Sequence, residues 1–217
     1  ESRGLGDVYK RQVNTTGPNN TALGQNTLYN NTTGGNNTAL GRLALYNNTT
    51  AYSNVSIGNS SMQSNTTGAS NVAVGTSALS TNSTASYNTA VGDLALTANT
   101  TASHNTAVGF SSMEANTTGT QNTAVGRKSL EANTTGNNNT CIGFNAGMSS
   151  TDTLQNTCVG SSALLNATGH NNVAIGYQAG RAMTTVSSNV LLGTQAGAAV
   201  TTGGENCFVG HTTGVAN

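Results

Sequence analysis

The chain has 217 residues, of which 35% are hydrophobic, 4% are aromatic and none is Trp, so a large conventional hydrophobic core is excluded. Only 6% of the residues are charged and the formal net charge is zero. The sequence therefore predicts no binding surface for nucleic acid and no membrane contact in this segment, and no apolar run approaches the roughly 20 residues of a membrane span.

Residues 1–12 differ from the rest of the chain. The run from Ser2 to Gln12, SRGLGDVYKRQ, resembles the translation of a sequencing-library adapter, so we expect residues 1–12 not to be native. A single β-roll repeat array is then expected over residues 13–217. Because the native start would be missing, the lack of a signal peptide says nothing about the compartment.

From Val13 onward the chain is one internal repeat. A pentapeptide of Asn, any residue, a small residue, an aliphatic residue and Gly recurs every seventeen residues, with a single step of sixteen. We call the Gly that ends each copy the repeat glycine. The repeat glycines are Gly24, Gly41, Gly58, Gly75, Gly92, Gly109, Gly126, Gly143, Gly160, Gly176, Gly193 and Gly210. Asn stands four residues before every one of them, and Val, Ile or Leu stands just before.

The residue types favour an all-β fold. Asn, Gly and β-branched residues are poor helix formers, so coiled coils and helical repeats are excluded. Disorder would suit the polar composition, but it would not keep an aliphatic residue at one register in every copy. We expect a parallel β-roll, or β-solenoid, of about twelve seventeen-residue coils.

Each coil is predicted to contain two short strands. In the first, alternation sends Thr123 and Val125 to one face and Ala124 to the other, and we expect the aliphatic face to be inside. The second is an Ala-Leu pair such as Ala44-Leu45, followed by an Asn-Thr-Thr-Gly turn. The repeat glycine should have a positive φ or no room for a Cβ atom. The predicted core of the repeat is Val74, Gly75, Val91, Gly92, Val108, Gly109, Val125, Gly126, Ile142 and Gly143.

Stacked coils should place equivalent residues over one another at about 4.8 Å per step, with Asn over Asn in amide ladders. Twelve coils would form a rod roughly 55 to 60 Å long. So thin a core needs a partner. The small residue two before the repeat glycine is predicted to point outward and to form a lengthwise trimer contact, through Ala73, Ala90, Ala107 and Ala124. Leu191 and Phe208 occupy this position in the last coils, and we expect the packing to change there.

The repeats resemble a known family. Asn-Thr-Ala-Val-Gly, Asn-Val-Ala-Ile-Gly (172–176) and Gly-Tyr-Gln-Ala-Gly (176–180) are similar to the YadA-like head repeats of trimeric autotransporter adhesins, and to related repeats in phage tail fibres. The resemblance covers nearly all of residues 13–217. It implies a left-handed trimer of parallel β-rolls that is exposed outside the cell and attaches to host surfaces. The longer coil, with its added Asn-Thr-Thr-Gly turn, departs from the commonest pattern.

No catalytic, cofactor or metal site is predicted. His104, His170 and His211 lie at three different registers, so stacking does not bring them together. Cys141 and Cys158 share a register on adjacent coils, within reach of a disulfide, but their parallel Cβ vectors favour two free thiols.

Two surfaces are candidates for binding. Phe110, Phe144 and Tyr177 share the register just after the repeat glycine and form a candidate line for glycan or protein attachment. The simpler interpretation is three isolated aromatics, since Arg127 and Ser161 interrupt the line. The Thr pairs of the turns would stack into a rank like those of ice-binding solenoids, but as one file rather than a lattice.

We therefore expect a non-catalytic segment of an attachment fibre on the cell surface or on a virion. Its partners are expected to be two further copies of itself and an unknown host protein or glycan. A bacterial adhesin is favoured over a phage tail fibre shaft, and an ice-binding β-solenoid is the alternative from another class.

Overall fold

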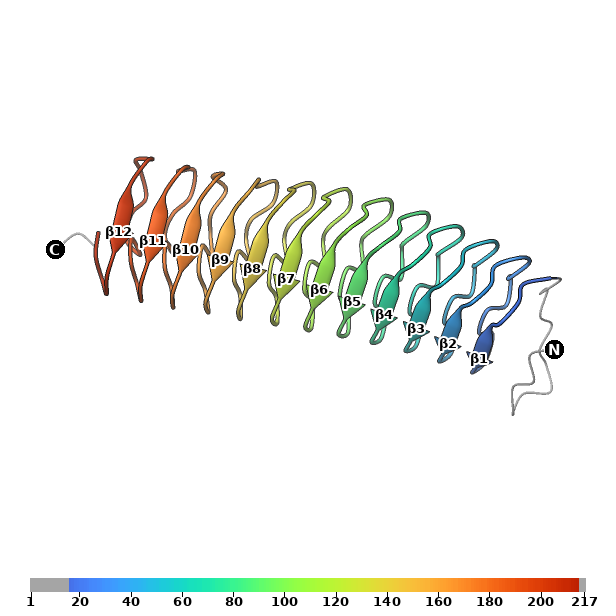
Figure 1. Cartoon of the computed structure of the whole chain (residues 1–217). Coiled ribbons are helices and arrows are strands. Elements are labelled where there is room, and N and C mark those ends of the chain that lie inside the picture. The colour runs from blue at the N-terminus through green and yellow to red at the C-terminus, as the bar shows by residue number, and fades with distance from the viewer. Residues whose placement is uncertain (1–15, 215–217) are drawn as a thin grey trace.

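The structure is a computed structural model that describes residues 16–214, so the predicted adapter segment, residues 1–12, lies outside the described part. Within that part the chain forms one all-β column, with the two ends of the chain at opposite ends of the column (Figure 1). Twelve parallel strands of three residues form one sheet in sequence order. The strands are β1 Thr21–Leu23, β2 Thr38–Leu40, β3 Val55–Ile57, β4 Val72–Val74, β5 Thr89–Val91, β6 Thr106–Val108, β7 Thr123–Val125, β8 Thr140–Ile142, β9 Thr157–Val159, β10 Val173–Ile175, β11 Val190–Leu192 and β12 Cys207–Val209.

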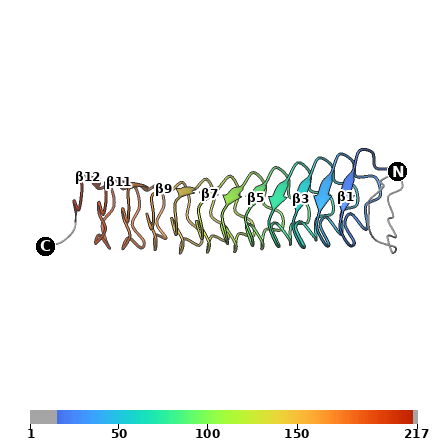
Figure 2. The same ribbon diagram turned by 90° about the horizontal axis from the view of Figure 1, so that it is seen from below.

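Neighbouring coils pair in register, as the seventeen-residue period predicts. Val74 pairs with Val91, and Val91 pairs with Val108. The sixteen-residue step between β9 and β10 keeps this register, because Val159 still pairs with Ile175. The strands run along one long side of the column and the turns along the other (Figure 2). The predicted β-solenoid is thus confirmed.

The predicted second strand of each coil is a turn instead. Leu45 and Leu96, which were expected to extend, have φ values of 50° and 51°, in the left-handed region. Such a residue turns the chain rather than continuing a strand. The turn carries the Leu side chain into the interior, where both residues are fully buried. This position, four after the repeat glycine, supplies the largest core side chain of most coils.

The predicted inside and outside of the strand are reversed. The small residue at the centre of each strand points into the column, and Ala73, Ala90, Ala107 and Ala124 are fully buried. Val74, Val91, Val108 and Val125, expected in the core, are half-buried on the outer face of the sheet, and Ile142 is exposed. The Leu side chain of the turn fills the narrow interior, which leaves room for only a methyl group opposite.

The predicted Asn ladder is present and fully buried over its central part. Asn105 accepts a hydrogen bond at Oδ1 from the backbone N–H of Asn122, 3.0 Å away, and its own N–H donates to Oδ1 of Asn88 at 2.9 Å. Its Nδ2 group donates to the carbonyl oxygen of Gly119 at 2.8 Å. Asn116 donates to the same carbonyl at 3.0 Å, from a second Asn file in the turn. The two files together satisfy backbone groups that the strands do not reach.

The repeat glycines form a file in which backbone lies against backbone. Gly92 has a φ of 135°, which L side chains rarely adopt. A Cβ atom on Gly92 would lie 2.5 Å from the carbonyl oxygen of Gly109 in the next coil. Both reasons expected for glycine at this position therefore hold together, and the coils approach one another closely only because no side chain stands between them.

Candidate functional site

The outer face of the sheet carries an unbroken file of aliphatic side chains, one from the last residue of each strand. We call it the aliphatic file. Its exposed members include Leu23, Leu40, Ile142, Ile175 and Val209, with exposed fractions from 39% to 63%. The remaining members are half-buried. The described part of the column thus presents a continuous apolar line that no other segment of residues 16–214 covers.

A second file, from the first residue of each strand, runs beside the aliphatic file. It holds Thr at Thr21, Thr38 and the first positions of β5 to β9, and Val or Cys elsewhere. The two files make a regular array along the sheet. By contrast, the buried Ala73, Ala90, Ala107 and Ala124 do not reach this face, so the predicted trimer contact through them is wrong.

The line of aromatics just after the repeat glycines includes a cation. The guanidinium carbon of Arg127 lies 5.8 Å from the ring centre of Phe110 and 5.4 Å from that of Phe144, so it stacks between the two rings. Arg127 therefore joins the two aromatics rather than interrupting them. Phe144 and Tyr177 are 46% and 51% exposed, and Ser161 lies between them in the same file. We call Phe110, Arg127, Phe144, Ser161 and Tyr177 the aromatic file.

Sequence reasoning missed two other ring pairs. Tyr29 stacks on Tyr46 with ring centres 5.3 Å apart, and Tyr87 stacks on His104 at 5.1 Å. Each pair joins equivalent positions of adjacent coils, seventeen residues apart, so the repeat register itself was the available signal. The position of Arg127 between Phe110 and Phe144 was detectable in the same way, because the three residues share one register.

The three histidines remain apart, as their registers predict. His104 stacks on Tyr87, His170 accepts a hydrogen bond at Nδ1 from the backbone N–H of Leu154 at 3.0 Å, and His211 lies in the last described turn. In residues 16–214 no three His, Cys, Asp or Glu side chains are grouped so as to hold a metal ion.

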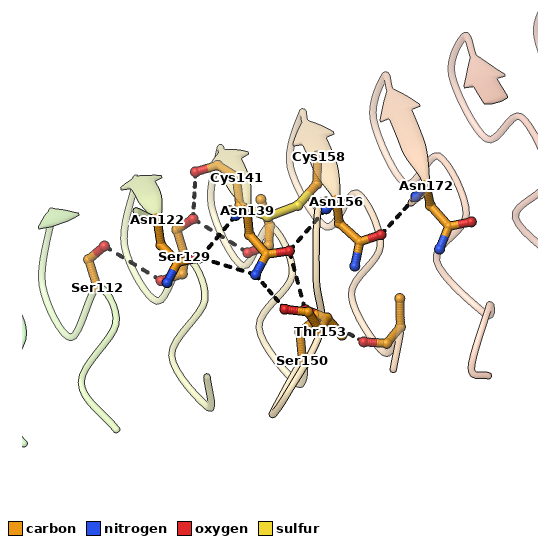
Figure 3. The surroundings of a disulfide bond; sticks show 12 residues. Ser112, Asn122, Ser129, Asn139, Cys141, Ser150, Thr153, Asn156, Cys158 and Asn172 are labelled. Carbon is orange, nitrogen blue, oxygen red and sulfur yellow. Dashed lines mark hydrogen bonds between the residues drawn. A yellow bond between two sulfur atoms is a disulfide. The ribbon is translucent and has the colours of Figure 1, made fainter. Parts of the chain in front are cut away.

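Cys141 and Cys158 form a disulfide in the buried interior, so the expected pair of free thiols is wrong (Figure 3). The two residues pair in register on β8 and β9 with their Cα atoms 4.4 Å apart. Gly147 makes space for the sulfur atoms, because a Cβ atom on it would lie 2.9 Å from Sγ of Cys141. From the preceding coil, the hydroxyl of Ser129 donates to the carbonyl of Cys141 at 2.8 Å (Figure 3). The third cysteine, Cys207, is exposed and free.

The Thr rank of the turns is engaged in holding the column together. Thr49 donates its hydroxyl to the backbone carbonyl of Thr66 at 3.0 Å, and Thr117 donates to that of Thr134 at 3.1 Å. These hydroxyl protons are thus used between coils, which leaves this rank less suited to binding ice than the sequence indicates.

Taken together, these features define a parallel β-solenoid with three exposed side-chain files: two on the outer face of the strands and the aromatic file just after the repeat glycines. No protein-family model, curated protein or solved structure matches the chain. Among the described residues, none lies in a helix long and apolar enough to cross a membrane.

Proposed function

We propose that this chain is a segment of a homotrimeric, non-catalytic attachment fibre that stands outside the cell and binds host or environmental surfaces. The observation that carries the proposal is the aliphatic file, which runs along all twelve strands on an open sheet face. At about 4.8 Å per coil the file is about 53 Å long. A contiguous apolar surface of this kind marks an interaction site.

A second and a third copy of the same chain are the partners that suit this face. The chain is nearly uncharged, so parallel copies do not repel one another. Each copy has the same spacing between coils, so side chains can match along the whole length. A parallel contact between unlike sides of two copies forms a closed ring when its rotation is a whole fraction of a turn, one third for a trimer. The likeness to YadA-like head repeats favours a ring of three and a bacterial adhesin.

The buried disulfide supports a location outside the cytosol. Disulfides persist in secreted and surface proteins and are rare in the reducing cytosol. Cys141 and Cys158 are both fully buried, so their disulfide lies in the interior of the column.

Sedimentation equilibrium on the full chain tests the trimer. We expect a mass three times the 21.7 kDa of one chain. The double variant Val108→Asp with Val125→Asp should sediment as a monomer, because it places charges in the contact. The matched control, Thr101→Asp with Thr118→Asp, changes exposed turn residues and should remain a trimer. A monomeric wild-type chain would contradict the proposal.

Attachment is tested separately, with beads coated with the chain and offered matrix proteins and glycans. Adhesion of the wild-type beads, above that of uncoated beads, is expected. A trimer that binds none of these surfaces would be a spacer rather than an adhesin.

Ice binding is a second candidate, because the two parallel files of Thr and aliphatic side chains on β5 to β9 repeat in two directions, as the single turn Thr rank does not. A trimer contact would cover this same face, so the two functions exclude each other. Thermal hysteresis of a monomeric chain, lost in the Val108→Asp, Val125→Asp variant, would favour ice binding.

A further inference from the structure

The aromatic file contains two gaps of the same size, and only one is filled. Phe110 and Phe144 are two coils apart, as are Phe144 and Tyr177, which corresponds to about 9.6 Å between equivalent atoms. In the first gap the Arg127 guanidinium lies between the two rings. In the second gap the intervening residue is Ser161, whose side chain is too short to reach between the rings. The chain itself thus shows that a two-coil gap admits a flat group.

We propose that the gap between Phe144 and Tyr177, over Ser161, binds one neutral pyranose ring of a glycan. This inference rests on the proposed attachment function and names its ligand class. A pyranose has two faces of C–H groups, and each needs an apolar surface about one van der Waals contact away. Phe144 and Tyr177 share one register and lie two coils apart, about 9.6 Å between equivalent backbone positions, so one aromatic side chain stands on each side of the gap. The sugar hydroxyl groups project from the edge of the ring, where they can reach solvent and the Ser161 hydroxyl.

The local charges favour a neutral ring over a cation. The Arg127 guanidinium already occupies one face of Phe144, 5.4 Å from the ring centre. A cation in the second gap would lie on the opposite face of that ring and would be repelled by Arg127. The carboxylate that the same register provides, Asp93, lies on the far side of Phe110 and accepts a hydrogen bond from the backbone N–H of Thr76 at 2.8 Å. It is too distant to attract a cation into the gap.

The gap is also prepared for binding before any ligand arrives. Stacking of Arg127 on one face restrains the Phe144 ring, so less side-chain freedom is lost when a sugar covers the other face. Next to Tyr177 in the chain, Gln178 accepts a hydrogen bond from the side chain of Gln195 in the following coil at 3.1 Å, which ties this side of the gap to its neighbour.

Saturation-transfer-difference NMR on the full chain tests the proposal. The probes are the methyl pyranosides of glucose, galactose, mannose and N-acetylglucosamine, with arginine methyl ester as the cationic comparison. We expect saturation transfer to the ring C–H protons of at least one pyranoside. Tyr177→Ala should weaken that binding by about tenfold, since it removes one of the two stacking surfaces.

The sharpest variant is Ser161→Arg, which fills the second gap as Arg127 fills the first and should abolish pyranoside binding while the column stays folded. Its matched control is Asn59→Arg, the same change in the same register away from the aromatics, and it should bind like the wild type. Unchanged binding by Ser161→Arg, no transfer to any pyranoside, or preferential binding of arginine methyl ester would overturn the proposal. Beads that still adhere to a protein surface in those cases would leave the attachment function standing.

Discussion

Leu191 extends into the space that Gly180 leaves open in the preceding coil: a Cβ atom on Gly180 would lie 2.6 Å from Cδ1 of Leu191, with Leu164 and Met183 next nearest at 2.8 and 2.9 Å. In the earlier coils a Leu of the turn shares the core with an Ala of the strand, as Leu96 does with Ala90, and both residues are fully buried. Toward the C-terminus the large side chain thus moves from the turn to the strand. The packing change predicted at Leu191 and Phe208 therefore lies in the interior and not on an outer surface: Leu191 is fully buried and Phe208 packs against the core.

This exchange predicts a compensating pair of substitutions. Leu191→Ala should lower the free energy of unfolding by about 2–5 kcal/mol, because it leaves a cavity beside Gly180. Adding Gly180→Leu should restore part of the loss, since the φ of Gly180, 63°, is close to the 51° of Leu96, while the flexible Met183 and Leu164 side chains must shift to admit it. Gly180→Leu alone should be destabilising through overpacking. Urea unfolding of the wild type, the two single variants and the double variant gives the coupling free energy between the two positions. Additive effects would show that the two side chains do not share one space.

The repeat glycines should tolerate no side chain. Gly92→Ala forces a Cβ atom to within 2.5 Å of the carbonyl oxygen of Gly109, at a φ of 135°. We expect a loss of roughly 3 kcal/mol or more. Thermal unfolding followed by circular dichroism measures it, with Asn59→Ala as the control at the neighbouring exposed register. A melting temperature equal to that of the wild type would contradict the close approach of the coils.

The central Asn ladder should matter more than its end. Asn105→Ala removes the acceptor of the Asn122 N–H and one of the two donors to the Gly119 carbonyl, so we expect a loss of about 2–4 kcal/mol. Asn206 lies in the last coil and is partly exposed, so Asn206→Ala should cost less. Urea unfolding compares the two variants. An equal loss in the free energy of unfolding at both positions would show that burial does not determine the contribution of a ladder Asn.

The disulfide should stabilise the column by constraining the unfolded chain. Cys141→Ala with Cys158→Ala opens a loop with a sequence separation of 17 residues, which corresponds to about 3 kcal/mol. Both replacements match the Ala found at this position in other coils, so strain from the new side chains should be small. Cys207→Ala, at an exposed free thiol, serves as control and should leave the urea midpoint unchanged. Mass spectrometry of the alkylated wild-type protein checks the pairing, and labelling of three thiols without reduction would refute it.

Much of this protein's fold could be predicted from the sequence alone. The seventeen-residue period predicted the coil, the parallel pairing of Val74 with Val91, the Asn ladder and the glycine file. These features depend on equivalent residues lying over one another, and any stacked coil with this period provides that. The aromatic register was readable for the same reason, although the stacking of Arg127 between Phe110 and Phe144 depends on side-chain reach.

Only the tertiary structure decided which face of the strand is inside. A three-residue strand has two faces, and hydrophobicity alone favours burial of Val91 over Ala90. The turn overrides this preference, because residues such as Leu96 adopt a left-handed conformation that curls the chain toward the Ala side. The Leu side chain then fills an interior too narrow for a second large residue, so the aliphatic file remains on the outside, where a partner can cover it. The spacing of residues along the sequence does not reveal how a coil closes on itself, since the closure depends on the sum of all the turns in that coil.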